Sequence, residues 1–343
     1  MKKIIFILIG ILLLTGCGSV DKDKVINNFV DVVESSKSYK LLGDMEIYND
    51  EDTYTYEMEV YYMDDNYFKV NMLNTINKNK QVILRDKESV YVVTPSLNKS
   101  YKFTSEWPYN SSQAYILNTL VEDINNDSDI KFEELEKEYV LEVDVNYPNN
   151  GDLKYQKIYF NKNLELIGVD VFDNEDILSI SVKFKSIDYK AGLDKEDFNI
   201  DKIMESECIN SEDGSDEVNS EVSDSKETAT LEDIIYPLYI PADTYLKDKE
   251  TINTETGERV ILTFNGAKNF VLIEESSYVN SEFETVPVYG DPLMITDTIG
   301  VVSSNSLSWS DNEVNYYLAS NDMSTDEILT IANSLNVTEY VGK

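Results

Sequence analysis

The chain has 343 residues, 42% of them hydrophobic, a length and composition that fit a folded protein of two domains. Its 65 Asp and Glu residues outnumber its 29 Lys and Arg residues, and the resulting formal net charge of −36 excludes nucleic acid as a partner. Histidine is absent, which excludes Ser-His-Asp and Cys-His nucleophilic sites and the H-E-x-x-H zinc motif.

The N-terminus has the pattern of a secretory signal, because Lys2 and Lys3 precede an apolar run over residues 4–14. This run is shorter than the roughly 20 residues that a membrane-spanning helix needs. Residues 14–17, Leu-Thr-Gly-Cys, resemble the lipobox of bacterial lipoproteins. The resemblance implies a signal peptide over residues 1–16, cleavage before Cys17 and a diacylglycerol on its sulfur. The alternative is an uncleaved signal anchor with an incidental cysteine.

We therefore expect a protein anchored by lipid to the extracytoplasmic face of the cell membrane. With Cys17 acylated, Cys208 is the other cysteine of the chain, so no intramolecular disulfide is expected.

Residues 21–36 are predicted to form a helix, since Val25, Phe29 and Val33 recur at helical spacing. From residue 39 to 103 the hydrophobic period changes to two, which is typical of antiparallel strands. The pattern is clearest over residues 53–62. There, one face is predicted to point towards the covering helices and any ligand, and it carries Tyr54, Tyr56, Met58, Val60 and Tyr62.

A second helix is predicted over residues 115–124, starting near Ser111 or Ser112. Strands are predicted to resume over residues 139–147, 154–160, 164–172 and 177–189. The order of a helix, about six strands, a helix and about four strands indicates an α+β domain over residues 17–203. In such a domain the helices cover one face of a large antiparallel sheet.

Residues 204–230 are rich in Glu, Asp and Ser and contain few large apolar side chains, so we expect a flexible acidic linker. Beyond it, residues 231–343 are predicted to form a smaller α+β domain. Its expected strands lie at 260–264, 269–274, 287–289, 299–302 and 314–318. Ser324 and Glu327 form a predicted capping box at the start of a closing helix.

One set of acidic residues has the spacing of a calcium loop. Residues at positions 1, 3, 5, 7 and 12 of such a loop bind the ion, and here they are Asp123, Asn125, Asp127, Asp129 and Glu134. The sixth position, which favours glycine, is Ser128, and the sequence after Glu134 resembles a strand more than a helix. A solvated loop between a helix and a strand is therefore the preferred interpretation, and no metal or cofactor is otherwise expected.

The element order of residues 21–203 resembles the LolA/LolB/RseB group, as do the local sequences at 159–161, 170–174 and 197–199. That resemblance implies a strongly curved half-barrel with helices in its concave mouth. Residues 235–335 resemble a small domain found in lipoproteins of endospore-forming Gram-positive bacteria. The combined plan resembles the YdcC-type sporulation lipoproteins and, more distantly, the germination lipoprotein GerS.

These resemblances imply a non-enzymatic protein that holds a lipid, an acyl chain or a partner protein against the concave face, in sporulation or germination. The likeness to GerS implies a peptidoglycan-processing enzyme as the partner. An alternative is a sensor of the RseB kind, in which two domains regulate a membrane signalling protein. A hydrolase with paired carboxylates is compatible with the absence of histidine, but no motif supports it.

Overall fold

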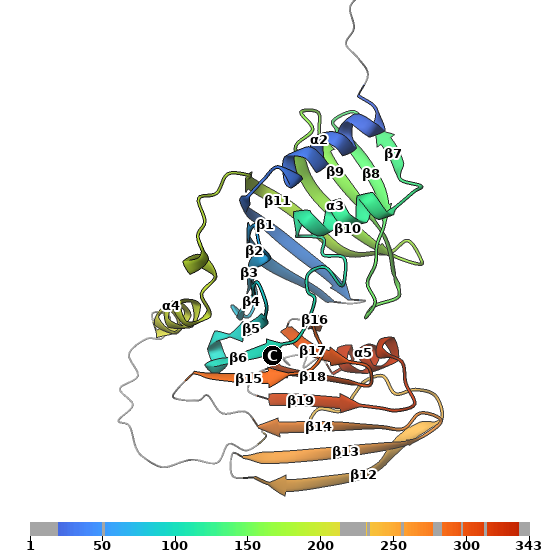
Figure 1. Cartoon of the computed structure of the whole chain (residues 1–343). Coiled ribbons are helices and arrows are strands. Elements are labelled where there is room, and N and C mark those ends of the chain that lie inside the picture. The colour runs from blue at the N-terminus through green and yellow to red at the C-terminus, as the bar shows by residue number, and fades with distance from the viewer. Residues whose placement is uncertain are drawn as a thin grey trace, which may run out of the picture.

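The computed structural model of the protein describes residues 20–49, 52–212, 231, 234–254, 257–276, 283–295, 298–311 and 314–335. The predicted signal peptide, Cys17 and residues 213–230 of the predicted linker lie outside this part of the chain. Within the described residues, no helix combines the length and the apolar character that crossing a membrane requires. We refer to described residues 20–212 as the N-terminal unit and to described residues 231–335 as the C-terminal unit (Figure 1).

The protein is α+β, with two open sheets that are almost entirely antiparallel. The larger sheet has twelve strands in the order β15-β6-β5-β4-β3-β2-β1-β11-β10-β9-β8-β7. Eleven of them come from the N-terminal unit: β1 (Ser38–Asn49), β2 (Asp52–Met63), β3 (Tyr67–Asn74), β4 (Lys80–Asp86), β5 (Val90–Thr94), β6 (Lys99–Phe103), β7 (Lys131–Glu134), β8 (Glu138–Asp144), β9 (Leu153–Asn161), β10 (Leu166–Asp173) and β11 (Leu178–Asp188).

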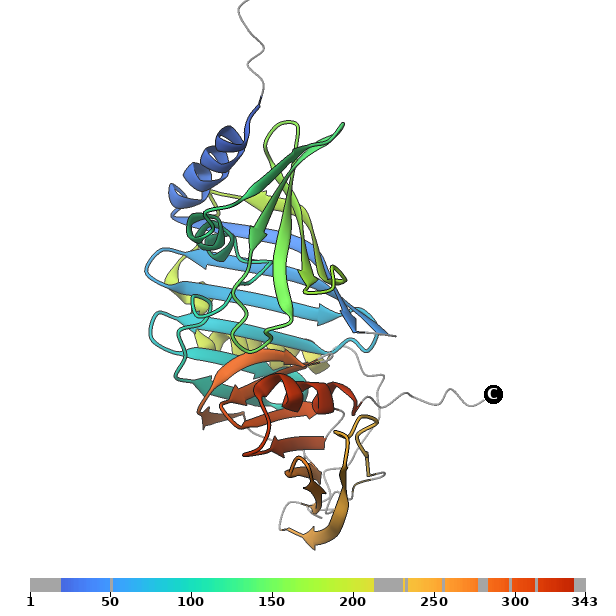
Figure 2. The ribbon, with the colours of Figure 1, turned by 90° about the vertical axis from the view of Figure 1, so that its right-hand side faces the viewer.

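Two helices cover the concave face of this sheet, α2 (Lys22–Glu34) and α3 (Leu117–Asn126). Figures 1 and 2 show both on the same side of the strands. Helix α2 begins where the Asp21 side chain accepts a hydrogen bond from the Lys24 backbone N–H at 2.9 Å. Its predicted stripe is buried, with Val25, Phe29 and Val33 in the core against the sheet.

Helix α3 begins at Leu117, later than the predicted start near Ser111 or Ser112. The Ser112 hydroxyl does not cap the helix, because it donates to the buried carboxylate of Asp123 at 2.8 Å. The backbone N–H of Ser112 donates to the carbonyl of Asn146 at 2.7 Å instead of taking part in a helical turn. Tertiary contacts thus hold residues 104–116 as a connection across the concave face.

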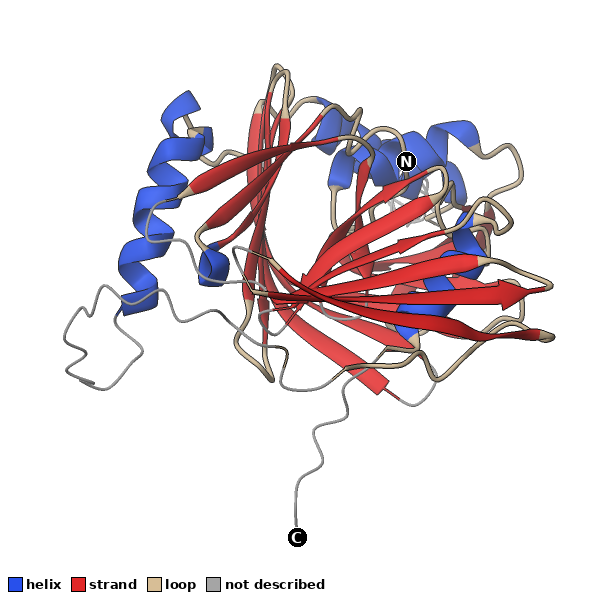
Figure 3. Cartoon of the chain, turned by 90° about the horizontal axis from the view of Figure 1, so that it is seen from below, coloured by secondary structure: helices blue, strands red, loops and turns tan. Residues whose placement is uncertain are grey.

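The opposite, convex face is covered by the last part of the N-terminal unit. Helix α4 (Ile200–Glu212) and the short 3-10 turn η2 (Lys195–Phe198) lie there, on the other side of the sheet from α2 and α3 (Figure 3). Phe198 and Ile203 pack on Leu84 and Val93. The first nine residues of the predicted linker are helical, because they continue α4, whose residues Ile200, Ile203 and Met204 find apolar contacts on this face.

The smaller sheet has seven strands in the order β12-β13-β14-β19-β18-β17-β16. Three of these, β12, β16 and β18, were not predicted. Helix α5 (Thr325–Asn333) packs against this sheet. The strands are β12 (Thr244–Asn253), β13 (Glu258–Gly266), β14 (Phe270–Ser276), β16 (Asp291–Ile295), β17 (Thr298–Ser303), β18 (Ser306–Asp311) and β19 (Val314–Ala319).

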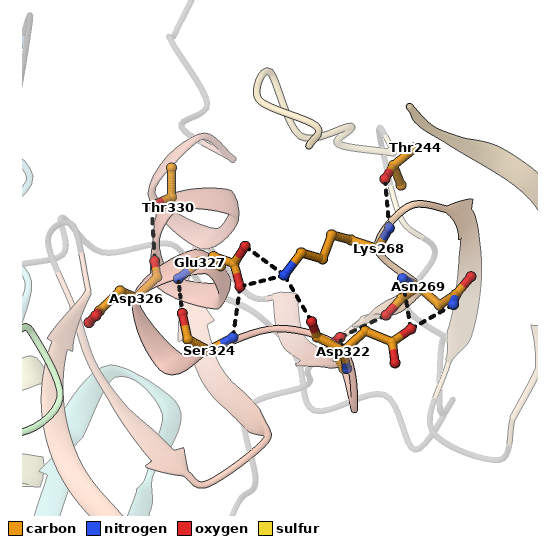
Figure 4. A network of polar contacts seen from close by, with 9 residues as sticks. Thr244, Lys268, Asn269, Asp322, Ser324, Asp326, Glu327 and Thr330 are labelled. Carbon is orange, nitrogen blue, oxygen red and sulfur yellow. Dashed lines mark hydrogen bonds and ion pairs between the residues drawn. The ribbon is translucent and has the colours of Figure 1, made fainter. Parts of the chain in front are cut away.

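The predicted capping box of α5 is confirmed, because the Ser324 hydroxyl accepts from the Glu327 N–H and the Glu327 carboxylate accepts from the Ser324 N–H. Lys268 extends this network, as Figure 4 shows: its Nζ lies 2.9 Å from Glu327 Oε1 and donates to the carbonyl of Asp322 at 3.0 Å. The turn between β13 and β14 is thereby fixed to the start of α5.

The two units are joined by a strand that crosses between them. Strand β15 (Glu284–Val288) was predicted, from residues 287–289, as part of the second domain, but it pairs with β6 in parallel and so extends the larger sheet. The hydroxyls of Ser100 and Thr285 lie 2.8 Å apart across this pair. In addition, Ile299 and Val301 of β17 belong to the core of the N-terminal unit.

Candidate functional site

A cavity of about 320 Å³ lies between the concave face of the larger sheet and the C-terminal unit. Its apolar wall on the N-terminal side comes from strands β1, β2, β4 and β11 and from the connection over residues 104–116. The C-terminal unit closes the cavity with β16, β17 and α5. The apolar lining residues include Met45, Ile47, Tyr54, Ile83, Trp107, Tyr115, Ile180, Leu293, Met294, Ile299 and Leu329.

The sheet side of the cavity follows from strand alternation. On β1, Met45 and Ile47 lie opposite Tyr56 and Tyr54 of β2, and all four point to the concave face. Met45 and Tyr56 are buried, whereas Ile47 and Tyr54 are only partly buried, and three of the four, Met45, Ile47 and Tyr54, line the cavity. The cavity therefore begins at the end of β1 and β2 that α2 and α3 leave uncovered.

Trp107 is positioned by a buried arginine on β4. Nη1 of Arg85 donates to the Trp107 carbonyl at 2.5 Å and to the Ser105 carbonyl at 3.1 Å. The Ser105 hydroxyl donates in turn to Oδ1 of Asp291 at 2.6 Å, which connects this loop to the first residue of β16. One side of the cavity is thus tied to the other by hydrogen bonds.

A second buried network positions the wall that contains Tyr115 and Tyr147. The Asp123 carboxylate on α3 accepts from the Ser112 hydroxyl and from Nε2 of Gln156 on β9, each at 2.8 Å. Burial raises the pKa of Asp123 from 3.8 to about 6. Burial also raises the pKa of Tyr115 and of Tyr147, so both phenols stay neutral at physiological pH.

The polar part of the cavity wall consists of carboxylates, amides and hydroxyls. Asp152, Asp173, Asp291 and Asp326 supply the carboxylates, and amide side chains come from Asn110, Gln113, Asn149, Asn150 and Asn333. An apolar floor with a few polar groups at its margin is the usual composition of a small-molecule or peptide-binding pocket. Chemically, this arrangement can bury an apolar group and accept hydrogen bonds from a polar head.

The five residues predicted to face a ligand do not all reach the cavity. All five side chains lie on the concave face, as predicted, but Tyr54 is the member of the set that lines the cavity. Tyr56, Met58, Val60 and Tyr62 are buried in the core. Tyr62, for instance, stacks on Tyr39, whose hydroxyl donates to Asn118 of α3 at 3.0 Å.

The sequence argument missed most of the cavity lining. Met45, Ile47 and Ile180 have the same alternation as β2, and this signal was available in the sequence. No local signal placed Trp107 there, nor Leu293 and Leu329 of the C-terminal unit, because they reach the cavity through pairings between distant segments.

The five residues with calcium-loop spacing do not come together as a loop around an ion. The Asp123 carboxylate points into the core, while Asp127 accepts backbone N–H groups of Asp129 and Asp144. Glu134 lies on β7, a strand that was not predicted, and pairs with Lys162 at 3.0 Å. Throughout the described ranges, no group of three or more acidic or cysteine residues is arranged to hold a metal ion. The calcium alternative stays a prediction, and the arrangement of these five residues does not favour it.

Comparisons with known proteins give a family and a close relative in sequence. A family model described as sporulation protein YdcC-like matches residues 1–198. The sporulation protein YdcC of Bacillus subtilis (strain 168) is 34% identical over 329 residues, which cover 96% of this chain and 94% of that protein.

Solved structures resemble the chain more distantly. A chain in the complex of Pseudomonas aeruginosa MucA and MucB is 10% identical with a TM-score of 0.33, covering 91% of this chain and 98% of that one. A chain in the complex of the CwlD amidase from Clostridioides difficile with the GerS lipoprotein is 15% identical with a TM-score of 0.31, covering 51% of this chain and 100% of that one. Scores this low carry over neither a ligand nor a partner.

Proposed function

The chain belongs to the YdcC-like family of sporulation proteins, and from this premise we propose that it is a non-enzymatic lipoprotein that binds an apolar group in the cavity between its two units. The apolar group belongs to a ligand or to a partner protein of the cell envelope. The protein is held on the extracytoplasmic face of the cell membrane by a diacylglycerol on Cys17.

The observation that carries this proposal is the composition of the cavity. Its lining includes Met45, Ile83, Trp107 and Ile299, which are apolar side chains buried in the described structure. Burying an apolar group there is favourable by roughly 25 cal/mol per Å² removed from water. The chain has no histidine, and the described lining residues include no cysteine, so these residues supply no imidazole or thiol for nucleophilic catalysis.

The anchor is supported by the sequence Leu-Thr-Gly-Cys at residues 14–17 and by the apolar run before it. Two acyl chains hold a protein at a membrane stably, where one chain gives only reversible binding. The test is the Cys17→Ala variant in a sporulating host. We expect the wild-type chain to incorporate labelled palmitate and the variant to remain an unprocessed precursor without label; equal labelling of the two would contradict the anchor.

Binding in the cavity is tested by filling it. Leu293 and Leu329 line the cavity from the C-terminal unit, and replacing both by tryptophan takes up its space. We expect full-length protein to bind a neutral apolar fluorophore, and the Leu293→Trp/Leu329→Trp variant to bind it at least about tenfold more weakly.

The matched control is Leu246→Trp, at an exposed position of β12 outside the cavity, which should leave binding unchanged. Equal binding by the filled variant, or no binding by the wild type, would overturn the proposal. Cross-linking in sporulating cells with a photoreactive residue at Thr330, on the cavity wall, then distinguishes a protein partner from a lipid ligand. Capture of a membrane signalling protein there would favour the sensor alternative.

A further inference from the structure

The charged side chains that line the cavity are all acidic. Among the residues that the structure describes, its lining includes Asp152, Asp173, Asp291 and Asp326 and no lysine or arginine. The four carboxylates come from separate elements: the loop between β8 and β9, the end of β10, the start of β16 and the first turn of α5. The fold therefore gathers acidic side chains from both units around an apolar floor.

Two of these carboxylates link the units without being neutralised. Asp291 Oδ1 accepts from the Ser105 hydroxyl at 2.6 Å, and Asp326 Oδ1 accepts from the Gly151 backbone N–H at 3.3 Å. Both donors are uncharged, so neither of these contacts pairs an aspartate with a positive charge.

The other two carboxylates are likewise held by neutral groups. Asp152 Oδ1 accepts from Nδ2 of Asn174 at 3.4 Å, and Asp173 Oδ1 accepts from the backbone N–H groups of Glu175 and Ile177 at 2.8 Å. Across the described residues, no lysine or arginine forms an ion pair with any of the four aspartates. The negative charge of the wall is thus uncompensated by the protein.

A separate observation indicates that the cavity wall favours a ligand that donates hydrogen bonds. Asn110 lies in the cavity wall, and its Oδ1 atom is buried without a hydrogen-bond partner in the described chain. A buried acceptor left unpaired costs roughly 1–3 kcal/mol. A primary ammonium carries three donors and no acceptor, so its chemistry complements both kinds of acceptor in this wall, the carboxylates and the Asn110 oxygen.

We propose that the cavity selects amphiphiles with a cationic, amine-type head over those with an anionic head. This inference rests on the proposed function, because it assigns the polar end of the ligand whose apolar end the floor buries. The four aspartates attract an ammonium, whereas they repel a fatty-acid carboxylate or a phosphate of equal chain length. The selectivity comes both from attraction of a cationic head group and from repulsion of an anionic one.

The test compares three probes with the same tail: dodecylammonium, dodecanol and dodecanoate, each below its micelle concentration and titrated into full-length protein by calorimetry. We expect dodecylammonium to bind at least about tenfold more tightly than dodecanoate, with dodecanol between them. Raising the ionic strength from about 0.05 to about 0.5 M should shrink the difference, since the wall is partly open to solvent.

Two sets of substitutions distinguish the effect of the four wall aspartates on binding from the effect of the protein's net charge. The wall variant combines Asp152→Asn, Asp173→Asn, Asp291→Asn and Asp326→Asn. It keeps the hydrogen-bond acceptors and removes four charges, so the ratio between the affinities for dodecylammonium and dodecanoate should fall to about one. The control removes four exposed charges that do not line the cavity, with Glu88→Gln, Glu133→Gln, Glu136→Gln and Asp201→Asn. It should keep the preference.

The outcomes distinguish the inference from the proposed function. If none of the three probes binds, the apolar site itself is wrong. If all three bind with equal affinity, or if the control set abolishes the preference as fully as the wall set does, the cavity binds apolar groups but the selectivity for amines is refuted. Thermal unfolding of the wall variant shows that a loss of preference is not a loss of folding.

Discussion

The Oε1 atom of Gln81 accepts a hydrogen bond from the backbone N–H of Ile299 at 2.8 Å, although the two residues lie 218 positions apart in the chain. The Nε2 atom of the same amide donates to the Thr298 hydroxyl at 3.0 Å. Gln81 is buried on β4, and both halves of its amide are used by β17. A single side chain therefore supplies two of the hydrogen bonds that hold the C-terminal unit on the larger sheet.

We expect Gln81→Leu to lower the free energy of unfolding by about 1–3 kcal/mol, because the Ile299 N–H loses its partner in a buried place. A double-mutant cycle with Thr298→Val isolates the side-chain part of this contact. Chemical denaturation of the wild type, both single variants and the double variant should give a coupling energy of about 0.5–1.5 kcal/mol. A coupling energy of zero would mean that Gln81 and Thr298 act independently.

The acidic segment over residues 213–230 is the expected site of protease cleavage, because its composition cannot build a core. Since β15 extends the larger sheet and β17 contributes to its core, we expect the two fragments to stay together after a single cut. Size-exclusion chromatography of the nicked protein should show one peak in buffer and two in denaturant. Two separate peaks in buffer would mean that the contact between the units is weak.

The two faces of β2 should respond differently to charge. Met58 is 2% exposed on the concave face, whereas Glu57 is exposed on the convex face. We expect Met58→Asp to lower the free energy of unfolding by at least about 3 kcal/mol or to prevent folding, because it buries an unpaired charge in place of a core side chain. Glu57→Lys should change it by less than about 0.5 kcal/mol.

Met58→Leu serves as the conservative comparison for this pair. It keeps the volume and apolar character of the side chain, and it should cost less than about 1.5 kcal/mol. Circular dichroism and urea denaturation of the three variants provide the measurement. A tolerated Met58→Asp together with a damaging Glu57→Lys would contradict the assignment of the faces.

The stability of the protein should depend on pH through Asp123. Its pKa in the folded chain is about 6, above the ordinary 3.8, because burial disfavours the ionised form. With the folded-state pKa raised, the carboxyl group favours folding most at a pH below its unfolded pKa. This contribution is lost as the pH rises through the folded pKa, and the full difference is roughly 3 kcal/mol.

The Asp123→Asn variant removes this titration. Between about pH 4 and about pH 7, we expect the unfolding free energy of the wild type to fall relative to that of the variant by up to roughly 3 kcal/mol. Comparing the two proteins at each pH cancels the response of the many surface carboxylates. A difference between them that stays constant with pH would show that Asp123 ionises normally.

Local patterns in the sequence determined most elements of the N-terminal unit, but not β7, α4 or the start of α3. The stripe of Val25, Phe29 and Val33 and the alternation through β2 were readable because helix and strand periods depend on neighbouring residues only. The capping box of Ser324 and Glu327 was readable for the same reason. One face of β2 was therefore assigned correctly to the concave side, while its role towards a ligand stays a prediction.

Other features depended on contacts between distant segments, and the tertiary structure alone decided them. Strand β15 joins the larger sheet because its backbone pairs with β6, and a short strand carries no sequence signal for its partner. Helix α3 starts late because Ser112 bonds to Asp123 and Asn146, and α4 forms where the convex face gives Ile203 a place to pack. The cavity arises in the same way. Trp107, Leu293 and Leu329 carry no local signal in the sequence, and only the docking of the C-terminal unit on the concave face makes them walls of one site.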